Sequence, residues 1–293
     1  MTDSQFGQSE WIFQFLAACG ISEGVVFEAG ASSPHSINNS SIFRRNGFRA
    51  LLCEADEKTY EEWKGVDRSC LTIVNKRIDY GRRGLERLLD ELQAPFSMEV
   101  LFFDIDGGEY QLLEGLDSYR PKLICVEYDN SYPLSIDYVP SRTRHGFQQA
   151  SSLAMFKLMR SKGYKYLKSF FHDHVFIADE FVEQHSDSIE RSNIKYGDNL
   201  FFDEAPKHLY HLNAVCANQA EGSGAAGIDF YDWKLRNLIS SEYLVDAKNF
   251  YCHLCASFYA LIPLVRSRGD TYFSQYVTAL ESFRSSYLWL VRC

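Results

Sequence analysis

The sequence predicts an α/β protein with a doubly wound, mainly parallel sheet of seven strands and a helical appendage at its C-terminal end. Three observations support this fold class: short apolar runs alternate with stretches of helical spacing, several runs end in acidic residues, and glycines follow many of the helical stretches. A continuous apolar run is typical of a strand buried on both faces of a parallel sheet. Strands that alternate with helices indicate βαβ units, and therefore a layer of helices on each face.

The individual strands and helices are predicted from two of these patterns, the short apolar runs and the helical spacing of apolar residues. Strands are predicted where short apolar runs lie between polar or glycine-containing segments, at residues 24–30, 49–54, 70–75, 100–103, 123–126, 164–168 and 175–178. Helices are predicted where apolar residues recur every three or four positions before a glycine or a polar turn, at residues 9–19, 36–46, 57–64, 85–92 and 150–161. Residues 181–220 are harder to assign.

The chain is predicted to contain two domains, residues 1–220 and residues 221–293. A segment rich in Gly, Ser and Ala at 221–227 is typical of a flexible boundary. Beyond it, residues such as Phe250, Leu254 and Phe258 recur at helical spacing and predict two or three helices. This extension is compatible with a lid over the site, a homodimer interface or a platform for an acceptor.

The composition narrows the class of function. The net charge of -9 argues against a protein that binds a nucleic-acid backbone through clustered Lys and Arg. The eight cysteines are scattered, several of them inside apolar runs, as is typical of free thiols in a reducing compartment. The sequence shows neither a signal peptide nor an apolar run long enough to cross a bilayer. We therefore expect a soluble cytoplasmic protein without a nucleic-acid partner.

The first predicted strand runs into a glycine turn, Glu28-Ala-Gly30-Ala31. Gly30 lets the backbone pass close to a neighbour, and the helix that follows offers free N–H groups to an anionic ligand. Glu54 ends the next strand, where nucleotide-binding doubly wound proteins place an acid that accepts from ribose hydroxyls. The alternatives are an ordinary strand–helix turn and a solvated glutamate. The pairing of turn and acid favours a nucleotide site.

Two neighbouring strands end in acidic residues. These are Asp104, Asp106 and Glu109 after one strand, and Glu127, Asp129 and Asn130 after the other. Because the carboxyl ends of parallel strands meet at one edge of the sheet, we expect the acids to line one crevice. Clustered carboxylates repel each other unless a cation or a hydrogen-bond donor lies among them, so a hard divalent cation is one expected ligand. The alternative is a hydrogen-bonded loop in which Asp106 caps the next helix.

Two segments contain histidines that are candidates for chemistry. His145 lies in the irregular segment 131–147, which is expected to lie over the crevice, so His145 is a candidate catalytic base. The alternative is an exposed loop histidine. In His172-Asp173-His174, two histidines share one face of a strand, as in some metal sites. No further ligand lies nearby in the sequence, which favours a turn that enters a strand.

These motifs resemble the class I S-adenosylmethionine-dependent methyltransferases, and among them the FkbM-type group and its relatives. The resemblance covers roughly residues 22–180. The segments that carry it are Val26-Phe-Glu-Ala-Gly30, Leu52-Cys-Glu-Ala-Asp56, Asp104-Ile-Asp-Gly-Gly-Glu109 followed by Leu113-Glu-Gly-Leu116, Pro121-Lys-Leu-Ile-Cys-Val-Glu-Tyr128 and the late helix from Ser151 to Tyr164. The chain departs from the usual pattern after Gly30, where the second glycine common in these enzymes is missing.

The resemblance implies a Rossmann-like fold, S-adenosylmethionine as cofactor, and a role for each matching residue. Glu28 and Gly30 would line the methionine moiety, and Ala31 would also contact the cofactor. Glu54 would hold the ribose hydroxyls, the residues from Asn75 to Asp79 would face the adenine, and Asp104 would lie beside the sulfonium and the acceptor. Catechol O-methyltransferase is similar in fold and holds magnesium with an acid after the fourth strand and an Asp-Asn pair after the fifth. By analogy, Asp104, Asp129 and Asn130 would hold Mg²⁺ here.

The resulting hypothesis is an O-methyltransferase that acts on a hydroxyl or carboxyl of a sugar or small metabolite, in glycan or secondary-metabolite biosynthesis. Asp104 or Asp106 would serve as the base, or a divalent ion would lower the pKa of the acceptor hydroxyl. One alternative is a binding or scaffolding protein that keeps the fold without transfer activity. A nicotinamide-dependent oxidoreductase is disfavoured because the turn lacks the Gly-x-Gly-x-x-Gly fingerprint.

Overall fold

The computed structural model describes residues 4–140, 149–209, 225–239, 244–267 and 269–291 of the chain. The chain forms two compact units. The first comprises the described residues within Met1–Asp129, Arg142–Ala150 and Met155–His208, and the second those within Asn130–Ser141, Ser151–Ala154 and Leu209–Cys293. The division therefore falls at residue 209 rather than at the predicted 221, and two short segments that follow the fifth strand belong to the second unit.

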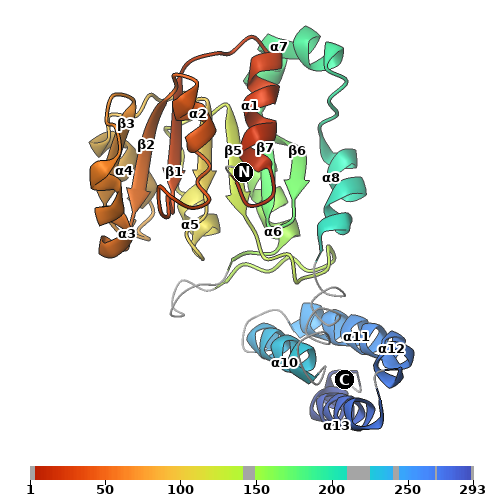
Figure 1. The fold of residues 1–293 in the computed structure, drawn as a ribbon. Coiled ribbons are helices and arrows are strands. Elements are labelled where there is room, and N and C mark those ends of the chain that lie inside the picture. Colours follow the sequence, from red (N-terminus) through yellow and green to blue (C-terminus); the bar gives the residue numbers. More distant parts are fainter. Residues whose placement is uncertain (1–3, 141–148, 210–224, 240–243, 268, 292–293) are drawn as a thin grey trace. The chain divides into compact units, whose positions relative to one another are not determined.

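The first unit is built on a seven-stranded sheet with the order β3-β2-β1-β4-β5-β7-β6 (Figure 1). The strands are β1 Val25–Ala29, β2 Arg49–Glu54, β3 Leu71–Asn75, β4 Val100–Phe103, β5 Leu123–Glu127, β6 Tyr164–Phe170 and β7 Asp173–Ala178. Pairing is parallel from β3 across to β5, and β7 runs antiparallel to both β5 and β6. The predicted doubly wound, mainly parallel sheet is confirmed.

Helices cover both faces of the sheet. In Figure 1, α1 and α2 lie in front of it and α5 and α6 behind it. The helices of this part are α1 Gln8–Ala18, α2 Ser41–Arg45, α3 Glu57–Glu62, α4 Gly84–Glu91, α5 Glu109–Glu114, α6 Ser152–Ser161, α7 Asp179–Arg191 and α8 Asp198–Glu204. Because the sheet is covered on both sides, every residue of β4 is at most 1% exposed. This explains why that strand reads as an unbroken apolar run.

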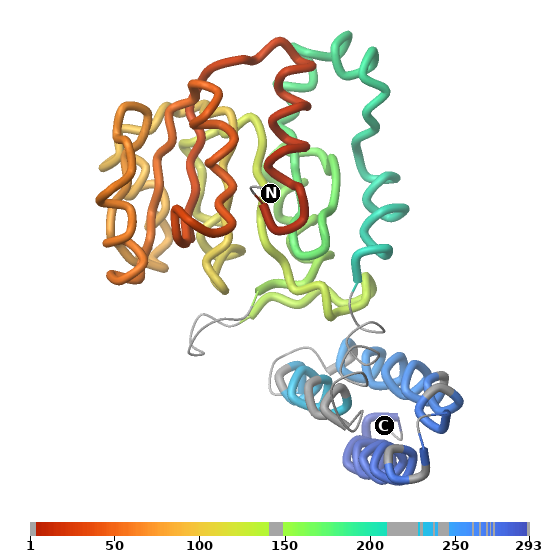
Figure 2. The backbone as a smooth tube through the Cα atoms, in the orientation of Figure 1, coloured from red at the N-terminus to blue at the C-terminus, as the bar shows by residue number. Residues whose placement is uncertain are grey.

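The order of the strands reverses between β1 and β4. The chain proceeds from β1 outward to β2 and β3, then returns to add β4 on the other side of β1. Figure 2 shows the red and orange strands β1 to β3 on one side of the sheet and the yellow and green strands on the other. In open α/β sheets, the loops that leave the carboxyl ends of strands diverge at such a reversal and leave a crevice for ligands.

Three predicted elements differ from the structure. The helix predicted at 36–46 is shortened to α2, because the buried carboxylate of Glu28 binds Asn38, Asn39 and Ser40 in a non-helical loop. The strand predicted at 175–178 begins earlier, at Asp173. Part of the segment 181–220 forms α7 and α8. The only buried side chains of α7 are Phe181, Val182 and Ile189, so apolar periodicity is sparse there.

The second unit contains the helices α10 Ala225–Ile239, α11 Leu244–Ala260, α12 Ile262–Arg266 and α13 Asp270–Tyr287. Its core includes the predicted Phe250, Leu254 and Phe258, which are fully buried. Tyr132 and Ile136, from the segment after β5, are buried in the same core. Among the described residues, no helix combines the length and the apolar character needed to cross a membrane.

Substitution of Gly30 tests how tightly β1 is packed against β4. Gly30 has a φ of +79°, and an added Cβ would lie 1.7 Å from the backbone oxygen of Asp104. We expect Gly30→Ala to destabilise the protein by more than about 3 kcal/mol, measured by urea unfolding.

Gly20→Ala is the matched control. Gly20 has the same φ of +79° but nothing within 4 Å of the added Cβ. It should cost only about 1–2 kcal/mol, the usual cost of a left-handed conformation. Equal losses for the two variants would show that the contact between Gly30 and Asp104 contributes nothing.

Candidate active site

A cleft of about 740 Å³ opens at the carboxyl ends of β1, β2, β4 and β5. Its walls come from the turn after β1, the end of β2, the segment after β3, the acidic loop after β4, the end of β5 and the turn between β6 and β7. The residues that line it are Gln5, Gly30, Ser32, Cys53, Glu54, Ala55, Asp56, Thr59, Lys76, Arg77, Ile78, Tyr80, Asp104, Ile105, Asp106, Glu127 and His172. The predicted crevice at the reversal of strand order is therefore present.

The turn after β1 is fixed to the end of β2. The N–H groups of Gly30 and Ala31 both donate to the carbonyl oxygen of Cys53, at 3.1 and 3.2 Å. Ser32 takes a left-handed φ of +51°, and its N–H donates to a carboxylate oxygen of Glu54 at 2.9 Å. The turn thus bends over β2 without the second glycine of the family pattern, since Ser32 itself adopts the left-handed conformation.

Glu54 occupies the position predicted for a ribose acceptor. Its side chain is 8% exposed, and its two carboxylate oxygens accept from the N–H groups of Ser32 and Asp56 at 2.9 and 2.7 Å. These bonds fix the orientation of the carboxylate in the wall of the cleft. A carboxylate has about four acceptor sites, so two backbone donors leave capacity for ligand hydroxyls.

Glu28 is not among the residues that line the cleft, although the resemblance implied a contact with the methionine moiety. Its carboxylate accepts from the Asn38 side chain and from the N–H groups of Asn39 and Ser40, at 2.9 to 3.0 Å. Burial raises the pKa of Glu28 to about 7, against the opposing effect of these hydrogen bonds. In the structure Glu28 holds the loop before α2.

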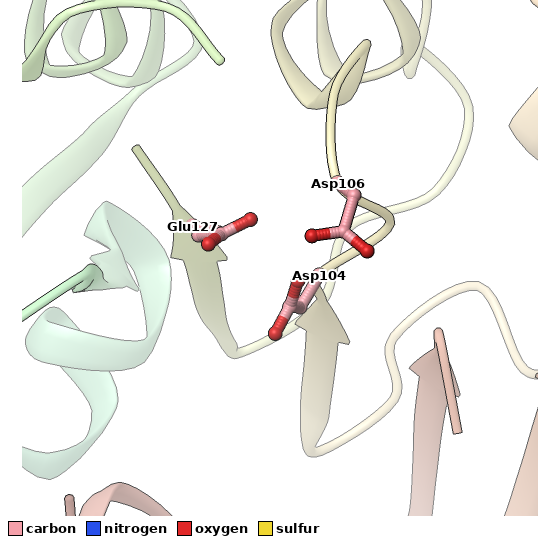
Figure 3. A group of neighbouring side chains, drawn as sticks. All are labelled: Asp104, Asp106 and Glu127. Carbon is pink, nitrogen blue, oxygen red and sulfur yellow. The ribbon is translucent and has the colours of Figure 1, made fainter. Parts of the chain in front are cut away.

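Three carboxylates meet at the centre of the cleft. Asp104 directly follows β4, Asp106 lies on the loop after it, and Glu127 ends β5 (Figure 3). One carboxylate oxygen from each lies within 4.8 Å of the others. Asp106 adopts a left-handed φ of +58°, which turns its side chain toward the other two instead of capping α5. The helix cap is Gly108.

The pKa values of Asp104 and Glu127 are both raised. Burial and the nearby Asp106 raise the pKa of Asp104, while a hydrogen bond with Glu127 opposes the rise. Burial and the charge of Asp104 raise the pKa of Glu127, and Gln149 donates to its second oxygen at 2.6 Å. Two ionised carboxylates this close to each other would repel, so each one favours the protonated form of its neighbour.

The side chain of Glu109 stabilises the acidic loop after β4 through hydrogen bonds. It is fully buried at the start of α5, and one carboxylate oxygen accepts from the N–H groups of Ile105 and Gly107 at 3.1 and 2.8 Å. Its other oxygen has no hydrogen-bond partner within the described residues. Burial raises the pKa of Glu109 to about 7. Glu109 fixes the loop that carries Asp106 and adds negative charge behind the cluster once ionised.

Several predicted site residues lie elsewhere. Asp129 and Asn130 are buried, 6% and 3% exposed, and are not part of the wall of the cleft. The carboxylate that joins Asp104 and Asp106 from this strand is Glu127 instead. The side chain of Asn75 donates to the backbone oxygen of Glu54, whereas Lys76, Arg77 and Ile78 of the same predicted segment line the cleft. His145 lies outside the described residues.

Tyr80 and His172 are among the cleft residues that were not predicted from the sequence. Tyr80 donates from its hydroxyl to the carbonyl oxygen of Gly107 at 3.0 Å, and its ring blocks a Cβ at Gly108. His172 reaches the cleft from the turn between β6 and β7. The turn itself was predicted from His172-Asp173-His174, but no pattern in the sequence indicates that this hairpin pairs with β5.

The comparisons with known proteins show likeness of structure only. No protein-family model matches the chain, and no curated protein matches it. The chain is similar to a SAM-dependent methyltransferase from Aquifex aeolicus, with 9% identity over 57% of this chain and 88% of that one, at a TM-score of 0.36. It is also similar to CalO1, a methyltransferase in calicheamicin biosynthesis, with 13% identity over 59% of this chain and 54% of that one, at a TM-score of 0.34. At these values the likeness carries no inference about activity.

Asp173, at the start of β7, makes stability depend on pH. It is buried, accepts from the Gln8 side chain at 3.1 Å, and has a pKa raised to about 8 by burial and by Asp104. The folded protein therefore holds a proton that the unfolded chain releases near pH 4, and this stabilisation is lost as the pH rises toward 8.

We expect Asp173→Asn to reduce the loss of stability between pH 5 and pH 8 by on the order of 1–3 kcal/mol, measured by urea unfolding at both pH values. Asp203→Asn, on the exposed surface of α8, is the control and should leave the pH dependence unchanged. A pH dependence that is the same in the wild type and Asp173→Asn would contradict the assignment of this proton.

Proposed function

We propose that this protein is an S-adenosylmethionine-dependent methyltransferase that methylates a hydroxyl or carboxyl oxygen of a sugar or small metabolite. The observation that carries the proposal is the single cleft lined by the ends of β1, β2, β4 and β5 at the reversal of strand order. Ligands of open α/β sheets bind at this point. Membership of the FkbM-type group, and a place in glycan or secondary-metabolite biosynthesis, are the finer form of the proposal and are supported by the acidic motif after β4.

The half of the cleft that faces β2 and β3 suits the nucleoside. The carboxylate of Glu54 is held rigid by two N–H donors and can accept from the ribose hydroxyls. Ile78, beyond the end of β3, offers an apolar surface for the adenine ring. Gly30 lies between the two halves of the cleft, and because its position allows no side chain, nothing from this residue separates them.

The half that faces β4 and β5 suits the transfer. The cofactor supplies a methyl group on a positively charged sulfur. Asp104 and Asp106 place negative charge where this sulfur and the acceptor oxygen would meet. Transfer requires the acceptor oxygen to be held in line with the methyl group and to lose its proton, and these carboxylates can orient the acceptor hydroxyl.

A divalent cation fits the same three carboxylates. Oxygens of Asp104, Asp106 and Glu127 that lie within 4.8 Å of one another can all reach a single hard cation, which binds oxygen at about 2.0–2.6 Å. The unpartnered buried oxygen of Glu109 adds negative potential near them. Mg²⁺ held there would lower the pKa of the acceptor hydroxyl.

The test of the cofactor is isothermal titration with S-adenosylmethionine and S-adenosylhomocysteine. We expect micromolar binding of both, and a loss of about tenfold or more in Glu54→Gln, which retains one acceptor for the neighbouring N–H groups but loses the charge. Glu57→Ala, exposed on α3 and outside the cleft, should bind as the wild type does. Absence of binding in the wild type would favour the scaffolding alternative.

The test of the cation is titration with Mn²⁺, followed by electron paramagnetic resonance. Because the pKa values of Asp104 and Glu127 are raised, a cation must compete with protons for these carboxylates, and we expect the affinity for Mn²⁺ to rise from pH 6 to pH 8. Asp106→Asn should weaken binding by about tenfold or more, whereas Asp67→Asn, on an exposed turn, should not change it. Binding that is independent of pH would contradict the raised pKa values.

A further inference from the structure

His172 is the one histidine among the residues that line the cleft in the described part of the chain. It lies in the tight turn between β6 and β7, and shares the cleft with Asp104, Asp106 and Glu127. Its side chain is half-buried. Within the described residues, no hydrogen bond occupies its ring nitrogens, so the imidazole is available to a ligand in the cleft.

The turn that carries His172 is held in place by the end of β5. The N–H of Tyr128 donates to the carbonyl oxygen of His172 at 2.9 Å, and the hydroxyl of Tyr128 donates to the carbonyl oxygen of Phe171 at 3.1 Å. The imidazole packs against the rings of Phe171 and Phe6, with centroids 4.4 and 5.7 Å away. These contacts fix the position of the ring without using its nitrogens.

His174, two residues further along, has the opposite character. It is fully buried and stacks on Tyr128 with ring centroids 3.6 Å apart. Its Nδ1 is hydrogen-bonded to the hydroxyl of Ser169 at 2.8 Å, and that hydroxyl is bonded in turn to Tyr166. His174 therefore belongs to the packing of the hairpin, and His172 belongs to the cleft.

From this geometry we propose that His172 is the general base of the transfer, placed on the side of the cleft where the acceptor binds. The inference rests on the proposed methyltransferase function and deepens it. It assigns to a hairpin histidine the role that the sequence suggested for His145. The acceptor class follows: a group whose oxygen carries a proton at neutral pH, which is a hydroxyl and not a carboxylate.

The step balances without any further reactant. The acceptor oxygen forms a bond to the methyl carbon, the bond between that carbon and sulfur breaks, and its electron pair returns to sulfur as a neutral thioether. The proton of the hydroxyl moves to a ring nitrogen of His172. The imidazolium then loses this proton to solvent at the open cleft.

The surroundings keep the imidazole neutral before the reaction and stabilise its charge afterwards. Burial lowers the pKa of His172, and the nearby Asp129 opposes this. Asp104 and Glu127 share the cleft with it, and the adjacent Asp173 is buried and bonded to Gln8. The Phe6 and Phe171 rings contribute no charge. When the neutral base becomes an imidazolium, the charge of Asp129 stabilises it.

The test compares two ligands that differ by one charge. Proton NMR in metal-free buffer would follow the titration of each imidazole with S-adenosylmethionine or S-adenosylhomocysteine bound, and the loss of one signal in His172→Gln would assign it. We expect the sulfonium to lower the proton affinity of His172 by about tenfold relative to the thioether, because like charges would lie within one cleft. His185 on α7, assigned by His185→Gln, should titrate identically with both ligands.

The outcomes separate the two proposals. If both ligands bind and His172 titrates identically with each, the base assignment is wrong while the cofactor remains. If neither ligand binds, the methyltransferase function fails, and the assignment of His172 fails with it.

A kinetic test uses the hydroxyl acceptor that a substrate panel identifies. His172→Gln should lose the acidic limb of the pH–rate profile, and His172→Gly should regain activity with added imidazole. Retention of that limb in His172→Gln would overturn the inference.

Discussion

The close approach of the turn after β1 to the end of β4 is the constraint on which the rest of the site depends. Gly30 lies so near the carbonyl oxygen of Asp104 that no side chain fits between them. The turn is therefore directed over β2, where its N–H groups donate hydrogen bonds to the carbonyl oxygen of Cys53 and the carboxylate of Glu54. As a result, Glu54 and Asp104 stand on two walls of one cleft, and both the nucleoside half and the transfer half take their shape from a single backbone contact.

The second organising influence is the mutual repulsion of the carboxyl groups in the cleft. Asp104 and Glu127 are close enough to repel if both were ionised, and the pKa values of both are raised. Glu109 stays largely buried beneath them with a raised pKa. The acidic side chains can therefore lie close together in the free protein. A cation or a ligand with several hydroxyl groups that enters the cleft can then bind to several carboxylate oxygens at once.

The strands could be predicted because burial on both faces leaves an unbroken apolar signature: β2 and β4 have the bounds expected from the sequence. The acidic ends of β4 and β5 could be predicted for the same reason. The sequence does not indicate which way a side chain points once the chain has left the end of a strand. Glu28 turns to the loop before α2, and Asp129 is buried away from the cluster. His172 reaches the cleft only through an antiparallel pairing between segments far apart in the chain.

The segment after β5 has a consequence for biosynthesis on the ribosome. Tyr132, Ile136 and Tyr138 are buried in a core whose other members come from the C-terminal helices. The chain that leaves the ribosome in order exposes these apolar side chains long before their partners are made. The core of the second unit therefore cannot form until the C-terminal helices that complete it have been made. A chain that stops near residue 208 would leave the three side chains uncovered and prone to aggregate.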